Sequence, residues 1–187
     1  MTQDYYKKQT AVLVNDPSIR AWGFIVVGIN EGKIEILEVG CIKTEPEAKK
    51  RRIRKGDDTV RRIQEVNATL LRLFKRYNIV HILTEQPHGS QSASAAVMIG
   101  MVTGMVQTIS DCLNVGVEWY SEGECKYYLL GKRSATKNEV KEAIKKIYKI
   151  NWTGVGYKDE AIADATAVFH FACTNSPMLA MLIKNSK

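Results

Sequence analysis

Three acidic residues stand where a carboxylate could do chemistry. Asp16 ends a short apolar run and is followed by Pro17, and Glu85 ends a second apolar run with Pro87 two residues further on. Asp164 lies among small and apolar residues, and a carboxylate on such a face needs a partner. Carboxylate oxygens suit hard cations such as Mg²⁺. Two such ions about 4 Å apart would promote phosphodiester hydrolysis.

Each acid also has an ordinary structural explanation. Asp16 and Glu85 could form turns at the ends of strands, and Asp164 could be half of an ion pair. Glu160 lies four residues before Asp164, so on a helix the two side chains face the same direction, about 40° apart. Asp159 lies well off that line. The set as a whole, and no single member, therefore favours a metal site.

A concentrated basic run accounts for much of the net charge of +7. Six of the seven positions from 49 to 55 are basic: Lys49, Lys50, Arg51, Arg52, Arg54 and Lys55. Such a run predicts an anionic partner, or else a solvated loop that keeps the protein soluble. The carboxylate set favours the first interpretation, with DNA as the partner.

Length and composition bound the class of protein. With 187 residues, 45% hydrophobic and 25% charged, the chain is expected to form one soluble domain, from 10 to 175. We expect 1–9 to be a polar tail without a secretory signal and 176–187 to be a C-terminal tail. The four cysteines are scattered, which predicts reduced thiols and no zinc site.

The longest apolar stretch, 93–109, is interrupted by Thr103, Gln107 and two glycines. It falls short of the roughly 20 residues that span a bilayer, so it predicts a buried helix. Gly100 and Gly104 would let that helix approach a neighbouring element closely. We therefore expect a cytoplasmic protein without a membrane partner or a small-molecule substrate.

Apolar residues that recur every two residues predict strands, and those that recur every 3.6 residues predict helices. These elements position the acids. Strands are expected at 10–15, 21–29, 33–43, 79–84 and 115–120. Helices are expected from a cap at Asp57 or Asp58 to about Tyr77, and at 93–111, 121–130, 138–148 and 159–173. This order predicts an α/β fold with a mixed five-stranded sheet and helices on both faces. Ligand sites in such sheets lie at strand ends, so Asp16 and Glu85 could share one edge.

Three segments resemble the acidic motifs of the RuvC-type Holliday junction resolvases, in order and with similar separations. They are VLVNDPS at 12–18, TEQ at 84–86 and ADATA at 163–167. The segment 40–44 is similar to the family's third strand, and 125–137 resembles its segment with two basic residues eleven positions apart. The resemblance runs from about 12 to 173.

This resemblance implies a ribonuclease H-like fold and a homodimer that makes symmetric nicks in four-way DNA junctions. It also implies two Mg²⁺ ions per active site, with Mn²⁺ as a substitute. Asp16, Glu85 and Asp164 match the family's metal-binding acids. Lys126 and Lys137 match its basic residues near the scissile phosphate, where they would grip DNA with the 49–55 run, and Lys137 would also serve catalysis.

The chain departs from the family pattern at several positions. The family commonly places a fourth ligand three residues before the last Asp, where this chain has Ala161. Glu160 is our candidate replacement as a catalytic metal ligand, with Asp159 in reserve. Near the second acid, where cellular enzymes of the family carry an aromatic residue, this chain has the segment 87–90, which contains His88. His88 could stack on a base or contact phosphate, or be a loop histidine without such a role.

Two further departures lie in the first motif, where the family usually has a small residue in place of Asn15 and glycine in place of Ser18. Together, the departures indicate a divergent branch such as phage or mobile-element resolvases. Two other functions stay open at this point. One is a ribonuclease H-like nuclease acting on other branched DNA or on hybrids. The other is a non-catalytic junction-binding protein.

Overall fold

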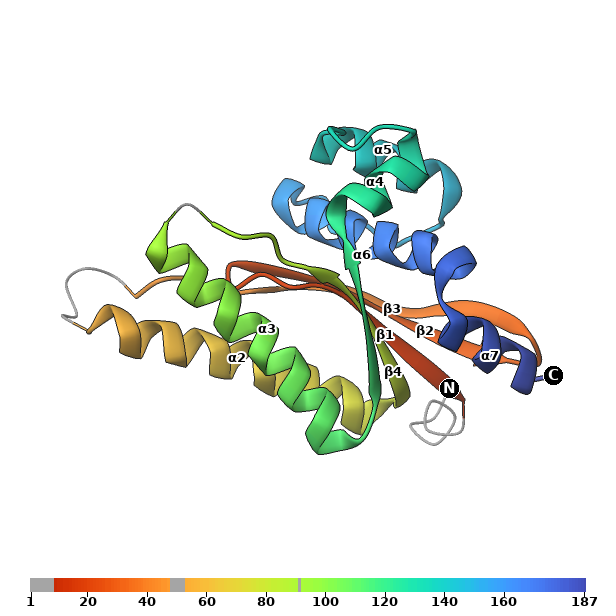
Figure 1. Cartoon of the computed structure of the whole chain (residues 1–187), viewed down its shortest axis with the longest axis horizontal. Helices are drawn as coiled ribbons and strands as arrows, with labels where there is room; N and C mark the ends of the chain where they lie inside the picture. The colour runs from red at the N-terminus through yellow and green to blue at the C-terminus, as the bar shows by residue number, and fades with distance from the viewer. Residues whose placement is uncertain (1–8, 48–52, 91) are drawn as a thin grey trace.

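The computed structural model describes residues 9–47, 53–90 and 92–187. Its sheet has the strand order β3-β2-β1-β4-β5 and separates two layers of helices (Figure 1). The strands are β1 (Thr10–Asp16), β2 (Ala21–Asn30), β3 (Lys33–Lys43), β4 (Asn78–Gln86) and β5 (Gly116–Ser121). The helices are α2 (Lys55–Arg76), α3 (Ala93–Leu113), α4 (Glu122–Leu130), α5 (Lys137–Ile147), α6 (Gly156–Asn175) and α7 (Pro177–Asn185).

The sheet is mixed, as predicted. β1, β2 and β3 pair antiparallel, and the turn between β2 and β3 places Glu31 and Gly32 at φ 49° and 73°. Two successive positive φ angles suit the tight turn that joins twisted hairpin strands. β4 and β5 are added parallel to β1, each through a helix. The carboxyl ends of three adjacent strands, β1, β4 and β5, therefore meet at one edge.

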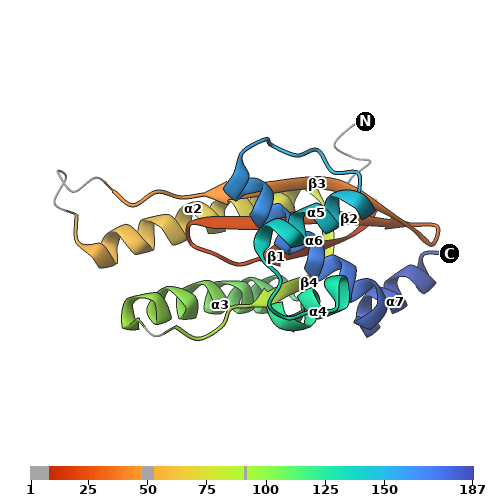
Figure 2. The ribbon, with the colours of Figure 1, turned by 90° about the horizontal axis from the view of Figure 1, so that it is seen from above.

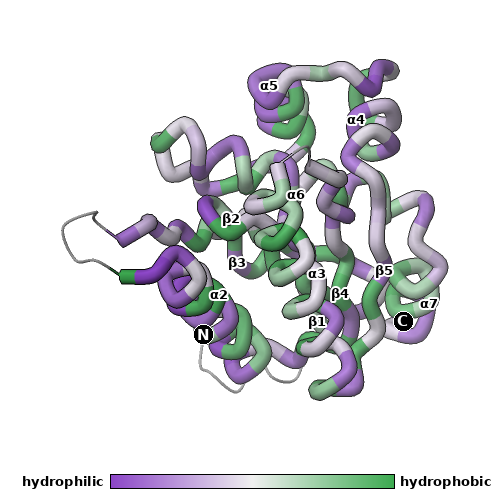
Figure 3. Tube along the Cα trace, turned by 60° about the vertical axis from the view of Figure 1, so that its left-hand side comes forward, coloured by the Kyte–Doolittle hydropathy of each residue, from purple (hydrophilic) through white to green (hydrophobic). Residues whose placement is uncertain are grey.

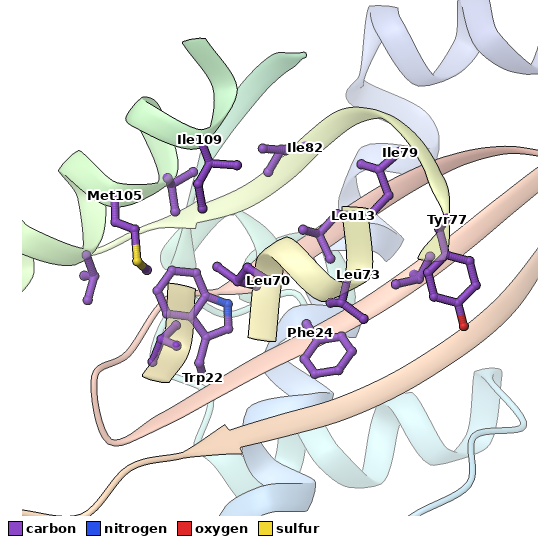
Figure 4. Packing of buried hydrophobic residues seen from close by; sticks show 14 of the residues in the cluster. Leu13, Trp22, Phe24, Leu70, Leu73, Tyr77, Ile79, Ile82, Met105 and Ile109 are labelled. Carbon is purple, nitrogen blue, oxygen red and sulfur yellow. The ribbon is translucent and has the colours of Figure 1, made fainter. Parts of the chain in front are cut away.

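Alternation along the central strand directs side chains to two separate cores. Ala11 and Leu13 of β1 face the layer of α2 and α3, whereas Val12 and Val14 face the layer of α6. Figure 4 shows the first core, where Trp22 packs beside Met105 and Leu70. Seen from above, α2 and α3 run alongside each other on one side of the molecule (Figure 2). The prediction of helices on both faces is confirmed.

Helix α6 lies directly on β2. A Cβ atom added to Gly23 would fall 1.9 Å from the carbonyl oxygen of Ala161, so glycine is required where the two backbones meet. Ala161 is 3% exposed and its neighbours Ile162 and Ala163 are fully buried in the core formed with α5. This contact sets how closely α6, which carries Asp164, approaches the sheet.

The expectation of a buried helix at 93–109 is only half correct. α3 has 21 residues and is long and apolar enough to span a membrane by length and composition alone. Val102, Met105 and Ile109 pack on the sheet, but only 28% of its apolar window is buried. The expected close approach of its glycines to a neighbour is wrong within the described part of the chain, where nothing lies within 4 Å of a Cβ added to Gly100 or Gly104.

The start of α2 differs from the predicted one. α2 begins at Lys55 with Arg54 at the N-cap, so neither Asp57 nor Asp58 is the cap. Asp58 instead accepts a hydrogen bond from the backbone N–H of Glu47 and pairs with Arg61 of the next turn.

α2 alternates between hydrophilic and hydrophobic stretches, as an amphipathic helix does (Figure 3).

The expected C-terminal tail contains helix α7. Ser176 caps this helix by accepting a hydrogen bond from the backbone N–H of Leu179, and Pro177 occupies its first turn. Leu179 is fully buried in the core formed by α6 and the sheet. The last twelve residues therefore include a packed element.

Candidate active site

Two of the predicted acids meet at the shared edge of the sheet. β1 and β4 are paired in register up to Asn15 and Thr84, so Asp16 and Glu85 are the next residues on adjacent parallel strands. Neither side-chain carboxylate forms a hydrogen bond with another residue in 9–47, 53–90 or 92–187, although both residues are more than half buried. Two neighbouring carboxylates without donors create a site that a cation would stabilise.

The electrostatics of these two residues agree with this geometry. Burial, reinforced by the negative charge of Asp164, raises the pKa of Asp16 to about 7. Burial, reinforced by the charge of Asp16, raises the pKa of Glu85 to about 9. Both shifts arise because like charges are held together away from water. A bound cation would reverse this effect.

Helix α6 brings the third acid to the same place. Asp164 accepts a hydrogen bond from Lys137 Nζ at 3.0 Å, and 11% of its side chain is exposed. Burial raises the pKa of Asp164, and the positive charge of Lys137 opposes this rise. Burial lowers the pKa of Lys137, but its hydrogen bond and charge interaction with Asp164 outweigh that effect, so the net shift is upward. Asp164 and Lys137 thus form a pair beside Asp16.

The two other acids of α6 differ in their surroundings. Asp159 is 7% exposed and accepts hydrogen bonds from Thr153 Oγ1 at 2.7 Å and from the backbone N–H groups of Thr153 and Gly154. Asp159 therefore anchors the loop before α6, which accounts for its carboxylate without a metal. Glu160 is partly buried, and its charge acts on Lys137.

The structure adds one acid that the sequence interpretation missed. Glu122 is the first residue of α4, directly after β5. Its charge acts on Asp16, Glu85 and Asp164. An acid at the end of a strand was the signal used for Asp16 and Glu85. The same signal was available for Glu122, but its place in a predicted helix concealed it.

Two predicted DNA-binding residues lie next to Glu122. Lys126 Nζ is 2.5 Å from Glu122 Oε1, one turn along α4, and 13% of the lysine side chain is exposed. His88 Nε2 lies 3.8 Å from Glu122 Oε2, and 58% of the histidine side chain is exposed. Lys126 and His88 therefore flank the acid cluster on the β4 and β5 side, while Lys137 flanks it on the α6 side.

The predicted basic run is only partly described. Lys49, Lys50, Arg51 and Arg52 lie outside the described residues. Arg54 is exposed, and Lys55 Nζ donates a hydrogen bond to Ser94 Oγ at 2.7 Å, which joins the start of α2 to the start of α3. The starts of α2 and α3 lie at the same end of the molecule as the carboxyl ends of β1 and β4 (Figures 1 and 2).

The departures in the first motif have structural roles. Asn15 is 1% exposed, and its Oδ1 accepts a hydrogen bond from Trp22 Nε1 at 3.1 Å. Ser18 Oγ accepts a hydrogen bond from the backbone N–H of Arg20. Asn15 thus links the end of β1 to the start of β2, directly beside Asp16. The carboxylate stays in place although the surrounding turn is built differently.

Comparison with known sequences gives a consistent result. A profile of the family described as crossover junction endodeoxyribonuclease RuvC matches residues 12–170. The RuvC of Orientia tsutsugamushi (strain Boryong) is 24% identical over 156 residues, which cover 83% of this chain and 91% of the relative. The RuvC of Shewanella frigidimarina (strain NCIMB 400) is 26% identical over 160 residues, 86% of each chain.

Solved structures agree on the fold. The structure of T. thermophilus RuvC in complex with a Holliday junction substrate has a TM-score of 0.65 and 22% identity, covering 87% of this chain and 94% of that one. The yeast mitochondrial Holliday junction resolvase has a TM-score of 0.59 and 15% identity, covering 93% and 80%. These similarities confirm the predicted ribonuclease H-like α/β fold. Because the profile spans most of the sequence, this chain belongs to the RuvC family of crossover junction endodeoxyribonucleases.

Proposed function

We propose that this chain resolves four-way DNA junctions by Mg²⁺-dependent hydrolysis, making symmetric nicks in opposing strands. The observation that carries the proposal is the meeting of Asp16 and Glu85 at the ends of adjacent parallel strands, with Asp164 reaching them from α6. The hydrogen-bond donors and positive charges near these three carboxylates are too few to offset their negative charge. Divalent cations that bind together with a DNA substrate would offset it. This is the chemistry expected of a family of junction endonucleases.

The residues present fit divalent cations such as Mg²⁺. No three histidine, cysteine or acidic side chains in the described part of the chain stand close enough to hold one ion together. Mg²⁺ does not need such a cage, because it is usually bound by one or two carboxylates with water and substrate phosphates completing its shell. Asp16 with Glu85, and Asp16 with Asp164, would each supply such a pair. The same oxygen ligands would accept Mn²⁺.

Each residue then has a distinct role in hydrolysis. When bound, two ions would activate a water molecule and stabilise the leaving oxygen. Asp16, whose charge interacts with those of both Glu85 and Asp164, would take part in both pairs. Lys137, whose side chain is 56% exposed, would turn from Asp164 towards the scissile phosphate and offset its developing negative charge.

DNA would cross the acid cluster between several basic side chains. Lys126 and His88 lie on the β4 and β5 side. The start of α2, which Lys55 opens and Arg54 caps, lies at the same end of the molecule in the other layer of helices (Figure 1). The basic residues at 49–52, which the sequence predicts to bind DNA, lie outside the described residues. Contacts of this kind would fix the position of the DNA backbone without reading its sequence. The compartment that fits such a substrate is the cytoplasm.

A second copy of the chain would bind along the outer face of α3. Val97 is 62% exposed, and Gly100 and Gly104 follow it at positions that face the same way. Nothing covers these glycines in the described residues. Small residues at this spacing let two helix backbones approach closely. Burying the apolar stripe of this 21-residue helix against a second copy would stabilise the dimer. A twofold pair of active sites would account for symmetric nicks.

The proposal is tested by cleavage of a labelled four-way junction beside duplex, flap and RNA–DNA hybrid substrates. We expect paired nicks in the junction with Mg²⁺, none with EDTA and none with the Asp16→Asn variant. Preferential cutting of a control substrate would indicate a ribonuclease H-like nuclease of other specificity. Tight junction binding without metal-dependent cutting would indicate a non-catalytic binding protein. Either result would overturn the proposed function.

A further inference from the structure

The sheet brings a fourth acid to the edge where Asp16 and Glu85 meet. β4 and β5 are parallel neighbours, and their pairing runs through Glu85 with Tyr120 and Gln86 with Ser121. Glu122 follows Ser121 directly. Three adjacent parallel strands, β1, β4 and β5, therefore each end with an acid at or next to their last residue.

The position that commonly holds the fourth ligand in this family cannot supply one here. Ala161 carries no donor atom on its side chain, is 3% exposed, and belongs to the turn of α6 whose backbone touches Gly23. Glu160, the replacement expected from the sequence, is one residue away. Its charge acts on Lys137, less strongly than Asp164 and Asp16 do, and it is not among the main charges acting on Asp16, Glu85 or Asp164.

Glu122 meets the requirements that Glu160 does not. Its charge is among the main ones acting on all three of the other acids. Its side chain is 36% exposed, so an ion or a phosphate arriving from solvent can reach it. Its present partners are Lys126 and His88, two groups that DNA phosphates could take over from the carboxylate.

We propose that Glu122 is the fourth acid of the metal centre and replaces the ligand that α6 lacks at Ala161. Glu122 would act from the start of α4, on the side of the cluster formed by β4 and β5. The assignment rests on the proposed function, because it places Glu122 in the same metal centre as Asp16, Glu85 and Asp164.

The test compares glutamine substitutions at three glutamates. Glu122→Gln removes the proposed ligand, and Glu160→Gln removes the rival. Glu124→Gln is the matched control, because it lies on the same helix and its capping interaction with Ser121 is one that glutamine also makes. Binding of Mn²⁺ to each protein is followed by electron paramagnetic resonance of the free ion. Junction cleavage and thermal unfolding in EDTA are measured on the same samples.

We expect Glu122→Gln to weaken Mn²⁺ binding at least about tenfold, a loss that even outer-shell partners of a metal can cause. Glu160→Gln and Glu124→Gln should bind within about twofold of the wild-type chain. Cleavage by Glu122→Gln should fall at low Mn²⁺ concentration and recover partly at high concentration. Its melting temperature in EDTA should equal or exceed that of the wild-type chain, because one of four repelling charges is gone.

Unchanged Mn²⁺ binding by Glu122→Gln, or loss of binding by Glu160→Gln instead, would overturn the assignment. A lower melting temperature in EDTA with unchanged Mn²⁺ binding would make Glu122 a structural partner of Lys126. The two proposals fail separately. Wild-type protein that binds Mn²⁺ but leaves the junction intact would remove the resolvase function, and Mn²⁺ binding by the variants would still decide the ligand.

Discussion

Lys137 Nζ lies 3.0 Å from Asp164 Oδ2, and this hydrogen bond joins the first residue of α5 to the middle of α6. The lysine charge lowers the pKa values of Asp16, Glu85 and Asp164, against the upward effect of burial. The Lys137 ammonium group therefore keeps three carboxylates closer to their ionised state, the state that binds metal ions. Its side chain is exposed enough to contact a phosphate as well.

Replacing Lys137 with methionine should lower junction cleavage by about 100-fold, the size of loss seen when one donor to a developing negative charge is removed. The acidic limb of the pH–rate profile should also move to higher pH. The sign follows because loss of the lysine raises the pKa of each carboxyl group, and the ligands then ionise only at higher pH. Lys137→Arg keeps the positive charge and should leave the limb near its original position. An unshifted limb in Lys137→Met would contradict this role.

Stability without metal should fall as pH rises. Asp16 and Glu85 have folded-state pKa values of about 7 and about 9, above those of unfolded carboxyl groups near 4. The folded chain therefore binds more protons than the unfolded chain in this window, so its free energy of unfolding decreases from about pH 4 to pH 9. Thermal unfolding in EDTA between pH 5 and pH 9 measures the slope.

Asp16→Asn should flatten that slope, because it removes one of the two shifted groups, and saturating Mg²⁺ should flatten it in the wild-type chain. Asp111→Asn, at the far end of α3, is the control and should leave the slope as it is. A melting temperature that rises with pH in EDTA would show that the carboxylates are already neutralised by another group.

Gly23→Ala should disturb the active site by displacing α6 from β2. Its new Cβ would fall 1.9 Å from the carbonyl oxygen of Ala161, so α6 must move and Asp164 must move with it. Overpacking of this kind costs about 1–3 kcal/mol, and each kcal/mol shifts the melting temperature of a domain this size by about 2–4 °C. Calorimetry and junction cleavage should both show a loss. Gly56→Ala, where no atom of residues 9–47, 53–90 or 92–187 lies within 4 Å of the added Cβ, should show neither.

Val97→Glu should convert the proposed dimer to a monomer, because it would place two charges in an apolar contact between helices. Sedimentation velocity measures the change, and circular dichroism checks that the fold is kept. Ile147→Glu alters a residue on α5 that is also exposed, at 51%, and should leave the mass unchanged. A Val97→Glu chain that still sediments as a dimer would place the interface elsewhere.

Local patterns in the sequence predicted the sheet, and with it the placement of Asp16 and Glu85 at the ends of neighbouring strands. Asp16 and Glu85 each close a strand of apolar residues, and parallel strands bring such positions together regardless of their separation in sequence. The start of α2 was predicted less well. Asp58 looks like a helix cap, but its carboxylate accepts a hydrogen bond from the backbone N–H of Glu47 and pairs with Arg61. The contact with Glu47 is a tertiary one that no local pattern contains.

The fourth acid shows where sequence spacing stops being informative. Glu160 and Asp164 share a helix face, which made Glu160 the natural candidate. The angle around a helix does not say which neighbour a side chain meets, and Glu160 acts on Lys137. Asp159, the reserve candidate from the sequence, accepts hydrogen bonds from the backbone N–H groups of Thr153 and Gly154. Glu122 required the pairing of β5 with β4, which only the folded chain displays.

The contact between Gly23 and Ala161 has a mechanical meaning for the site. Most helices rest on sheets through side chains, which change rotamer and let the spacing adjust by small amounts. Here backbone rests on backbone, and a backbone contact has no rotamers. The distance between α6 and the sheet, and with it the distance of Asp164 from the strands, is therefore fixed by the backbone. A shift that brought α6 closer to β2 would push the carbonyl oxygen of Ala161 into the backbone of Gly23.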